Sequence, residues 1–107
     1  MTWRRRRRRG KRGRFPKSVA IPNPPKVDKL VPTPQSDPRI ILIEPAEVEA
    51  LRLVDLEGLS QGEAGLEMGI SRGTIWRLLQ SARRKVVQAL TEGRPLVVSA
   101  EMNQTTQ

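Results

Sequence analysis

The sequence contains neither cysteine nor histidine among its 107 residues. Their absence excludes disulfides, thiolate or imidazole metal sites, cysteine nucleophiles and histidine-based catalytic triads. Aromatic residues make up 3% of the chain and nine residues are proline, so a large core cannot include the whole length. No apolar run approaches the roughly 18 residues of a membrane span, and no apolar segment follows the basic N-terminus as in a secretory signal. We therefore expect no metal, no cofactor, no membrane partner and a cytoplasmic location.

Few side chains in this sequence can act as a general acid or base in catalysis. Carboxylates are the remaining candidates, and the sequence arranges no pair of them around an evident pocket. We expect a protein that is not an enzyme, with no small-molecule substrate.

The positive charge of +9 is concentrated at the N-terminus. Nine of the 20 Lys and Arg residues lie in 1–14, which leaves 11 basic residues against 11 acidic ones in the rest of the chain. Like charges repel, so residues 1–14 are expected to be a disordered arm that neutralises phosphates. An arginine run does not distinguish DNA from RNA, and a solvated solubilising tail is the alternative interpretation. The basic residues of this arm are Arg4, Arg5, Arg6, Arg7, Arg8, Arg9, Lys11, Arg12 and Arg14.

Residues 15–38 contain seven of the nine prolines. Proline denies hydrogen bonds to helices and sheets, so we expect an extended, semi-rigid linker. Its apolar side chains are expected to lie along the surface of the following domain (Val19, Ile21, Val27, Leu30 and Val31). Residues 101–107 are expected to form a polar tail.

Residues 39–100 predict a mainly α domain with three helices and one or two short flanking strands. The apolar runs at 39–43 and 95–99 predict strands that could pair with each other. The first helix, at about 45–57, is apolar on more than one side through Val48, Leu51, Leu53, Val54 and Leu56, so it should be sandwiched. Ser60 and Glu63 form a capping box for a second helix that ends at Gly69, with Ala64 and Met68 facing inward. Gly65 suits a close approach of two helices, and Ile70 should fill the turn.

The third helix, at about 72–91 and capped by Ser71, has two sharply different faces. At about 100° per residue, one face is apolar (Ile75, Leu78, Leu79, Ala82, Val86, Ala89 and Leu90). The opposite face holds Gly73, Arg77, Gln80, Arg84 and Gln88. Residues 68–91 contain five basic residues and no acid, whereas residues 44–67 contain seven acids and one arginine. A polyanion should therefore be attracted to the third helix and repelled by the first two.

A helix, a tight turn and a second helix with a basic outer face are typical of a helix-turn-helix that places one helix in the major groove of DNA. Residues near the start of the third helix are expected to reach bases (Arg72, Thr74, Trp76, Arg77 and Gln80). A second set is expected to contact the DNA backbone (Ser71, Gly73, Arg83, Arg84 and Lys85). For the basic residues, a solvated helix face is the alternative. Trp76 could stack on a base or thymine methyl, or be covered by linker residues.

The segment GLSQGEAGLEMGISRGTIWRLLQSARRKVVQAL resembles region 4 of bacterial sigma factors, with a shared GLS start, EA pair, MGISRGTI turn and basic continuation. The longer stretch from EVEALRLV to PLVV is similar to a family of small, uncharacterised prokaryotic proteins that are predicted to bind DNA through such a helix-turn-helix. The resemblance covers about residues 40–98 and implies a sequence-selective DNA-binding protein. Members of that family often carry N-terminal cysteines, and this chain has none.

Together these patterns predict a transcriptional regulator that binds double-stranded DNA on the nucleoid. A homodimer would fit, because one short helix-turn-helix reads only a small half-site. Two other interpretations stay open. One is a sigma-like interaction module that binds RNA polymerase or another protein through the acidic helices, and the other is an RNA- or ribosome-associated basic protein.

Overall fold

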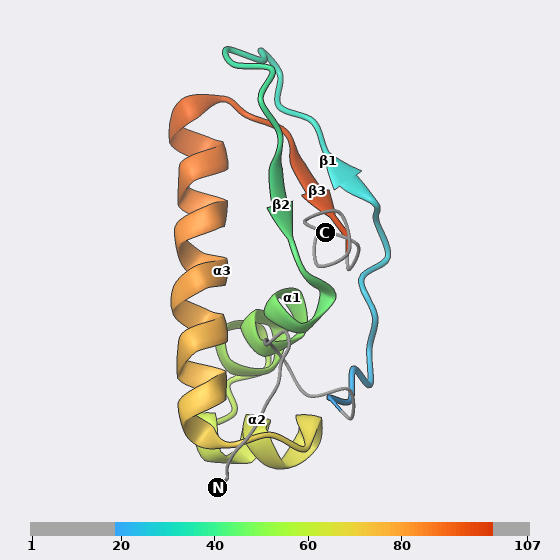
Figure 1. Cartoon of the computed structure of the whole chain (residues 1–107), viewed down its shortest axis with the longest axis vertical. Helices are drawn as coiled ribbons and strands as arrows, with labels where there is room; N and C mark the ends of the chain where they lie inside the picture. The colour runs from blue at the N-terminus through green and yellow to red at the C-terminus, as the bar shows by residue number, and fades with distance from the viewer. Residues whose placement is uncertain (1–18, 100–107) are drawn as a thin grey trace, which may run out of the picture.

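The computed structural model describes residues 19–99, in which the helices follow one another along the chain between two strands that pair side by side (Figure 1). The short strand β1 (Lys29–Leu30) comes first, followed by β2 (Ile41–Ile43) and helix α1 (Pro45–Leu51). A π-helical turn, η1 (Arg52–Leu56), then leads to α2 (Gln61–Met68), α3 (Arg72–Glu92) and β3 (Leu96–Val98). The mainly α architecture and the three predicted helical regions are confirmed. The basic arm at 1–14 and the tail at 101–107 lie outside the described residues.

The helix ends follow the local signals in the sequence. The Ser60 hydroxyl accepts from the Glu63 amide, and the Glu63 carboxylate accepts from the Ser60 amide, so the predicted capping box begins α2. Gly69 ends α2 with a φ of 70°, and Gly93 ends α3 with a φ of 65°. These left-handed conformations favour glycine because it has no Cβ. The start of α2 and the ends of α2 and α3 are therefore set by cap residues that can be read from the sequence.

The first predicted helix changes its hydrogen-bond pattern partway. Regular α-helix ends at Leu51, and the chain continues as η1, in which the Glu57 amide donates to the Arg52 carbonyl five residues earlier at 2.9 Å. The sequence predicted one continuous helix over 45–57 and did not reveal this wider turn. Leu53 is buried as expected, whereas Leu56 is 77% exposed and does not belong to the sandwiched face.

The sheet has the strand order β1-β3-β2. Strands β2 and β3 run parallel, with Ile41 opposite Leu96 and Ile43 opposite Val98, which confirms the predicted pairing of the two apolar runs. Parallel neighbours need a long crossover, and here the three helices supply it. Strand β1 runs antiparallel to β3 and comes from the proline-rich segment, where no strand was expected.

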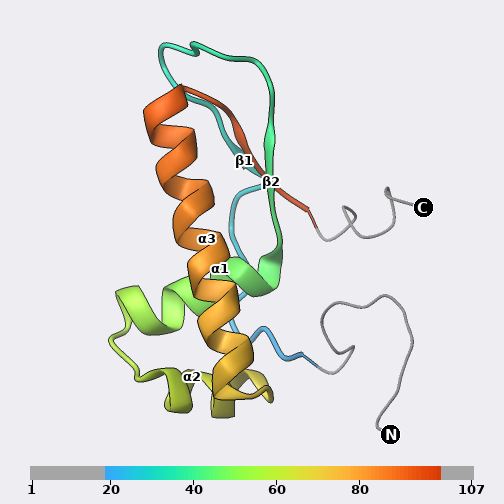
Figure 2. The ribbon, with the colours of Figure 1, turned by 60° about the vertical axis from the view of Figure 1, so that its left-hand side comes forward.

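Two apolar clusters hold the layers together. The first joins α1, α2 and the N-terminal half of α3, and it includes Met68, Ile75 and Leu79, all fully buried. The second joins β2 and β3 to Ala82, Val86 and Ala89 farther along α3. Leu51 contacts both clusters. Helices α1 and α2 thus surround one half of α3, and the sheet lies against the other half (Figure 2).

The proline-rich segment lies along the domain and is bonded to it at several points. The Ala20 amide donates to the Met68 carbonyl at 2.9 Å, and the Ser36 amide donates to the Gly93 carbonyl at 3.0 Å. Val19 and Ile21 pack against the first cluster, as predicted, while the three apolar residues farther along remain about half exposed (Val27, Leu30 and Val31). Hydrogen bonds near both ends of α3 therefore fix the path of this segment.

The predicted apolar face of α3 is confirmed up to its last turn. Ile75, Leu78, Leu79 and Ala82 are buried, and Val86 and Ala89 are partly buried. Leu90 was predicted to lie on this face, and that prediction is wrong because its side chain is 78% exposed. At 100° per residue, Leu90 lies about 70° from the middle of the buried face, beyond the reach of the sheet.

Candidate nucleic-acid interface

The N-terminus of α3 carries a chain of polar contacts through three predicted site residues. The Ser71 hydroxyl accepts from the Thr74 amide at 3.1 Å and lies 2.9 Å from the Thr74 hydroxyl. Arg77 donates through Nη2 to that hydroxyl at 3.4 Å. Ser71 and Thr74 therefore form the helix cap, and Thr74 directs the guanidinium of Arg77 along the outer side of the helix.

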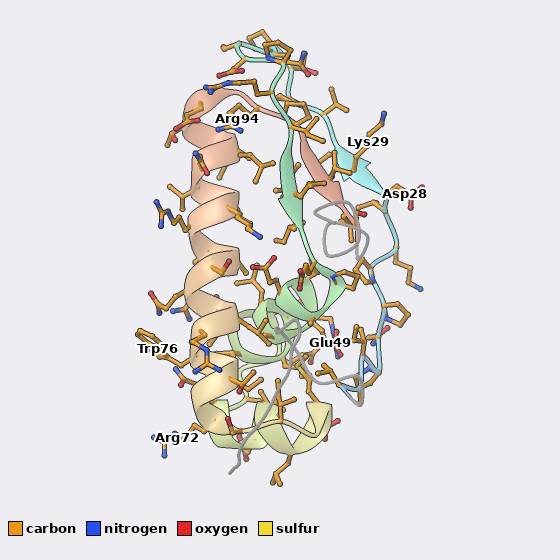
Figure 3. All side chains as sticks on the ribbon, in the orientation of Figure 1. Asp28, Lys29, Glu49, Arg72, Trp76 and Arg94 are labelled. Atoms are coloured by element: carbon orange, nitrogen blue, oxygen red, sulfur yellow. The ribbon has the colours of Figure 1, made fainter. Side chains whose placement is uncertain are left out.

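The outer face of α3 is exposed over almost its whole length. Arg72, Arg77, Gln80 and Arg84 are exposed, and Trp76 is 52% exposed. Figure 3 shows Arg72 and Trp76 extending from the side of α3 that faces away from the sheet. Within residues 19–99, Arg72, Gln80 and Arg84 form no hydrogen bond or ion pair with another side chain. The structure thus brings together five polar or aromatic groups that an external partner could contact.

Gly73 lies on this face with open space around it. A Cβ atom built on Gly73 would meet only the Ser71 hydroxyl oxygen, at 3.9 Å, which is an ordinary contact. Its φ is not in the left-handed region. Neither packing nor backbone conformation requires glycine there, so the small residue at Gly73 is free to serve a close approach from outside.

Arg83, which was predicted to contact DNA backbone, has a partner inside the protein. Its Nε and Nη2 atoms donate to the two carboxylate oxygens of Asp55 at 3.0 and 2.7 Å. The hydrogen bonds from Arg83 lower the pKa of Asp55, and Asp55 in turn raises the pKa of Arg83. Both side chains remain about 40% exposed. Arg83 therefore lies at the edge of the outer face and is turned toward η1.

Lys85 lies on the inner side of α3 rather than on its outer face. Its Nζ donates to Oε1 of Glu47 at 2.7 Å, and the Lys85 side chain is only 20% exposed. The Ser81 hydroxyl also donates a hydrogen bond to the Glu47 carboxylate. This geometry argues against the predicted backbone contact by Lys85, because its ammonium group already neutralises a buried carboxylate. Sequence spacing placed Lys85 beside Arg84, whereas a step of about 100° sends the two side chains in different directions.

The acidic character of the first two helices is weaker at the surface than the sequence suggests. Three of the seven acids in residues 44–67 are buried, namely Glu44, Glu47 and Glu49. Glu49 is fully buried and accepts two hydrogen bonds from Arg52, both at 2.9 Å. The other four acids are exposed, so the expected repulsion of a polyanion rests on fewer surface charges than the sequence suggests.

An open groove of about 500 Å³ lies between the proline-rich segment and α1, and its aliphatic lining includes Pro24, Pro25, Val48, Leu51 and Leu56. The carboxylate at its edge, Glu57, pairs with Arg52 at 3.1 Å. No cluster of acidic side chains in 19–99 is arranged to hold a metal ion. Over the same range, no helix has both the length and the apolar character needed to cross a membrane.

The two ion pairs that basic residues of α3 form with distant acids were missed by sequence reasoning. Asp55 is 28 positions from Arg83, and no local spacing rule links η1 to α3. The predicted contacts in 1–14 lie outside the described residues, so the structure places only the α3 residues of the predicted site.

Comparison with known proteins identifies relatives but no structural match. No solved structure matches the chain. The chain is 52% identical over 86 residues to "UPF0251 protein PH0803" of Pyrococcus horikoshii, covering 76% of each chain. It is 41% identical over 93 residues to a "UPF0251 protein" of Archaeoglobus fulgidus, covering 86% of this chain and 89% of that protein.

A bacterial relative is also similar over a shorter range. The chain is 54% identical over 61 residues to "UPF0251 protein VPA0321" of Vibrio parahaemolyticus, covering 57% of this chain and 64% of that protein. The family model described as "Protein of unknown function DUF134" matches residues 4–105. The chain therefore belongs to this family, which occurs in archaea and bacteria.

Proposed function

We propose that this protein is a sequence-selective DNA-binding protein that acts in transcriptional regulation. In this proposal α3 enters the major groove, and the basic arm at 1–14 binds nearby phosphates. The observation that carries the proposal is the outer face of α3, where Arg72, Arg77 and Arg84 are exposed and form no ion pair with another described residue. The α2–turn–α3 pair also spans the segment that resembles sigma factor region 4. Such an arrangement would place the protein on the nucleoid.

The proposed roles along α3 follow from how far each side chain can reach. Arg77 and Gln80 extend from the outer face near its N-terminal half, where a helix in the major groove contacts base edges. Arginine can pair bidentately with guanine, and glutamine can pair with adenine. Gly73 would allow the DNA backbone or a base edge to approach closely. Ser71 and Thr74 serve chiefly as the cap that holds this end of the helix in place.

Selection of bound sequences from random duplex DNA tests this proposal, with structured RNA run in parallel over a salt series. We expect a short shared DNA motif, and we expect Arg77→Ala to weaken binding to that motif by about 5- to 150-fold, the loss of one bidentate base contact. Arg39→Ala is the matched control, because Arg39 is exposed and pairs with Asp37 far from the N-terminus of α3. Equal affinity for every polymer, abolished by deleting 1–14, would contradict sequence selection and favour a general polyanion-binding protein.

Adjacent basic residues in α3 give a second test. Arg84→Gln should make the dependence of log K on log salt shallower by about 0.9, the effect of one lost phosphate contact, with no change in the unfolding temperature. Lys85→Gln should leave this slope unchanged and lower the free energy of unfolding by about 1–3 kcal/mol, because it removes a charged donor from buried Glu47. Binding titrations and thermal unfolding of the two variants measure both quantities. A shallower slope for Lys85→Gln would show that Lys85 leaves Glu47 to bind DNA.

A second candidate function rests on two exposed leucines. Leu56 in η1 and Leu66 in α2 are 77% and 85% exposed, on the elements that carry the remaining surface acids. Contact with a protein such as RNA polymerase would cover them. The selection experiment separates the two functions, since a protein-interaction module would return no DNA motif. The homodimer also stays a prediction. A second copy of the chain would bind the second half-site of the DNA.

A further inference from the structure

Among residues 19–99, the ion pair between Asp55 and Arg83 brings an acid to the edge of the basic face. It joins η1 to α3 through two parallel N–H···O bonds of 3.0 and 2.7 Å. Guanidinium groups form the same bidentate arrangement with phosphates. The Asp55 carboxylate therefore occupies the position on Arg83 that a DNA phosphate would take.

The location of Arg83 makes such a competition geometrically reasonable. At 100° per residue, Arg83 lies about 90° from the midline of the face formed by Gly73, Arg77, Gln80 and Arg84. A helix lying in a groove has phosphates along its flanks, and base edges beneath its midline. Arg83 thus lies where a backbone contact would form, with 43% of its side chain exposed. The pair is not locked in a core, because the Asp55 side chain is 40% exposed as well.

We propose that Asp55 is a built-in competitor of DNA phosphate for Arg83 and so limits the sequence-independent affinity of the α3 face. This inference rests on the proposed function. In the wild-type protein Arg83 stays on Asp55 and adds nothing to phosphate binding. Loss of the Asp55 charge releases Arg83 to make one further phosphate contact. Each such contact steepens the salt dependence of duplex binding by about 0.9 in log K against log salt.

Four full-length proteins test the proposal, namely wild type, Asp55→Asn, Arg83→Gln and the double variant. Affinity for a duplex of fixed sequence is measured across a salt series. We expect Asp55→Asn to steepen the slope by about 0.9 and to bind up to about tenfold more tightly near 0.1 M salt. Arg83→Gln and the double variant should keep the wild-type slope. Asp37→Asn is the matched control, because it also removes one acid from an arginine, Arg39, near the opposite end of α3.

Three results would overturn the proposal. A slope that is shallower for Arg83→Gln than for wild type would show that Arg83 already binds phosphate. An unchanged slope for Asp55→Asn would show that the released guanidinium does not reach the DNA. A gain that persists in the double variant, or that Asp37→Asn reproduces, would assign the effect to net charge alone. Asp55→Ala is the second variant and carries the same expectations if Asp55→Asn does not fold.

A heparin column separates failure of this inference from failure of the proposed function. Heparin is a polyanion that carries no base sequence, so it reports the release of Arg83 even if DNA is not the partner. Later elution of Asp55→Asn, reversed in the double variant, supports the competition. Identical elution of all four proteins overturns it. Failure of the wild-type protein to select any DNA motif would overturn the proposed function and leave the heparin result to decide the role of Asp55.

Discussion

Glu49→Ala is expected to lower the free energy of unfolding by about 3–5 kcal/mol, the usual cost of breaking a buried ion pair. Glu49 is fully buried, and its carboxylate accepts two hydrogen bonds from Arg52 at 2.9 Å. The same carboxylate accepts from the backbone N–H of Asn23 at 3.3 Å, which attaches the proline-rich segment to α1. The variant would leave a guanidinium that is only 22% exposed with one fewer partner. A loss of this size corresponds to a fall of more than about 12 °C in the unfolding temperature.

Glu57→Ala is the matched control for Glu49→Ala, because both carboxylates bind the same arginine. Glu57 accepts from Arg52 at 3.1 Å but is 49% exposed, so its loss should cost less than about 1 kcal/mol. Chemical denaturation of the two variants under identical conditions compares them. Equal losses would show that burial of Glu49 contributes nothing beyond the ion pair itself.

Gly65→Ala is expected to lower the free energy of unfolding by about 2–3 kcal/mol through overpacking. A Cβ atom at Gly65 would lie 2.6 Å from the Ile70 carbonyl oxygen and 3.6 Å from the Arg72 amide nitrogen. Both atoms belong to backbone, in the turn that joins α2 to α3, and they cannot move aside as a flexible side chain can. The Gly65 carbonyl also accepts from the Ile70 amide at 2.9 Å, so a shift of the turn would strain this bond.

Gly62→Ala, in the same helix, is expected to change the stability in the opposite direction. Its Cβ would meet only the Ser60 hydroxyl oxygen at 3.9 Å, so alanine should raise stability by up to about 1 kcal/mol through helix propensity. Thermal unfolding of both variants measures the difference. If Gly65→Ala were as stable as Gly62→Ala, the close approach of α2 to the turn would not determine the choice of residue.

Local signals explain why the helices could be predicted from the sequence. The helix ends are defined by hydrogen bonds between residues only a few positions apart, so the spacing of the cap residues is sufficient to predict them. These residues are Ser60 with Glu63, Gly69, Ser71 and Gly93. The buried face of α3 was likewise readable, because one helical period governs it. Gly65 was expected where two helices approach each other, because a helix tolerates glycine only at a cost of about 1 kcal/mol. The close approach exists, but the backbone that Gly65 meets is that of the turn and the first residue of α3.

Contacts between distant residues explain what could not be predicted. Lys85 and Glu47 are 38 positions apart, and Arg83 and Asp55 are 28 apart. A helical pattern shows that a charge lies on a given side of a helix, but not which element packs there. The two-residue strand β1 was missed for a related reason, because its pairing with β3 depends on a partner nearly 70 positions later. The candidate site was therefore predicted as a face of α3, without the internal partners that divide its basic residues.

The parallel pairing of β2 with β3 has a consequence for the order in which the protein forms during synthesis. Ile41 meets Leu96, 55 positions farther along the chain, and the three helices lie between them. The helices can begin to form as they leave the ribosome, because their hydrogen bonds are local. The sheet must wait until β3 has emerged, and distant pairings of this kind are slow to form. Until then Ile41 and Ile43 have no β3 strand to pair with, so the nascent chain passes through a stage in which these apolar side chains lack the cover that they have in the folded protein.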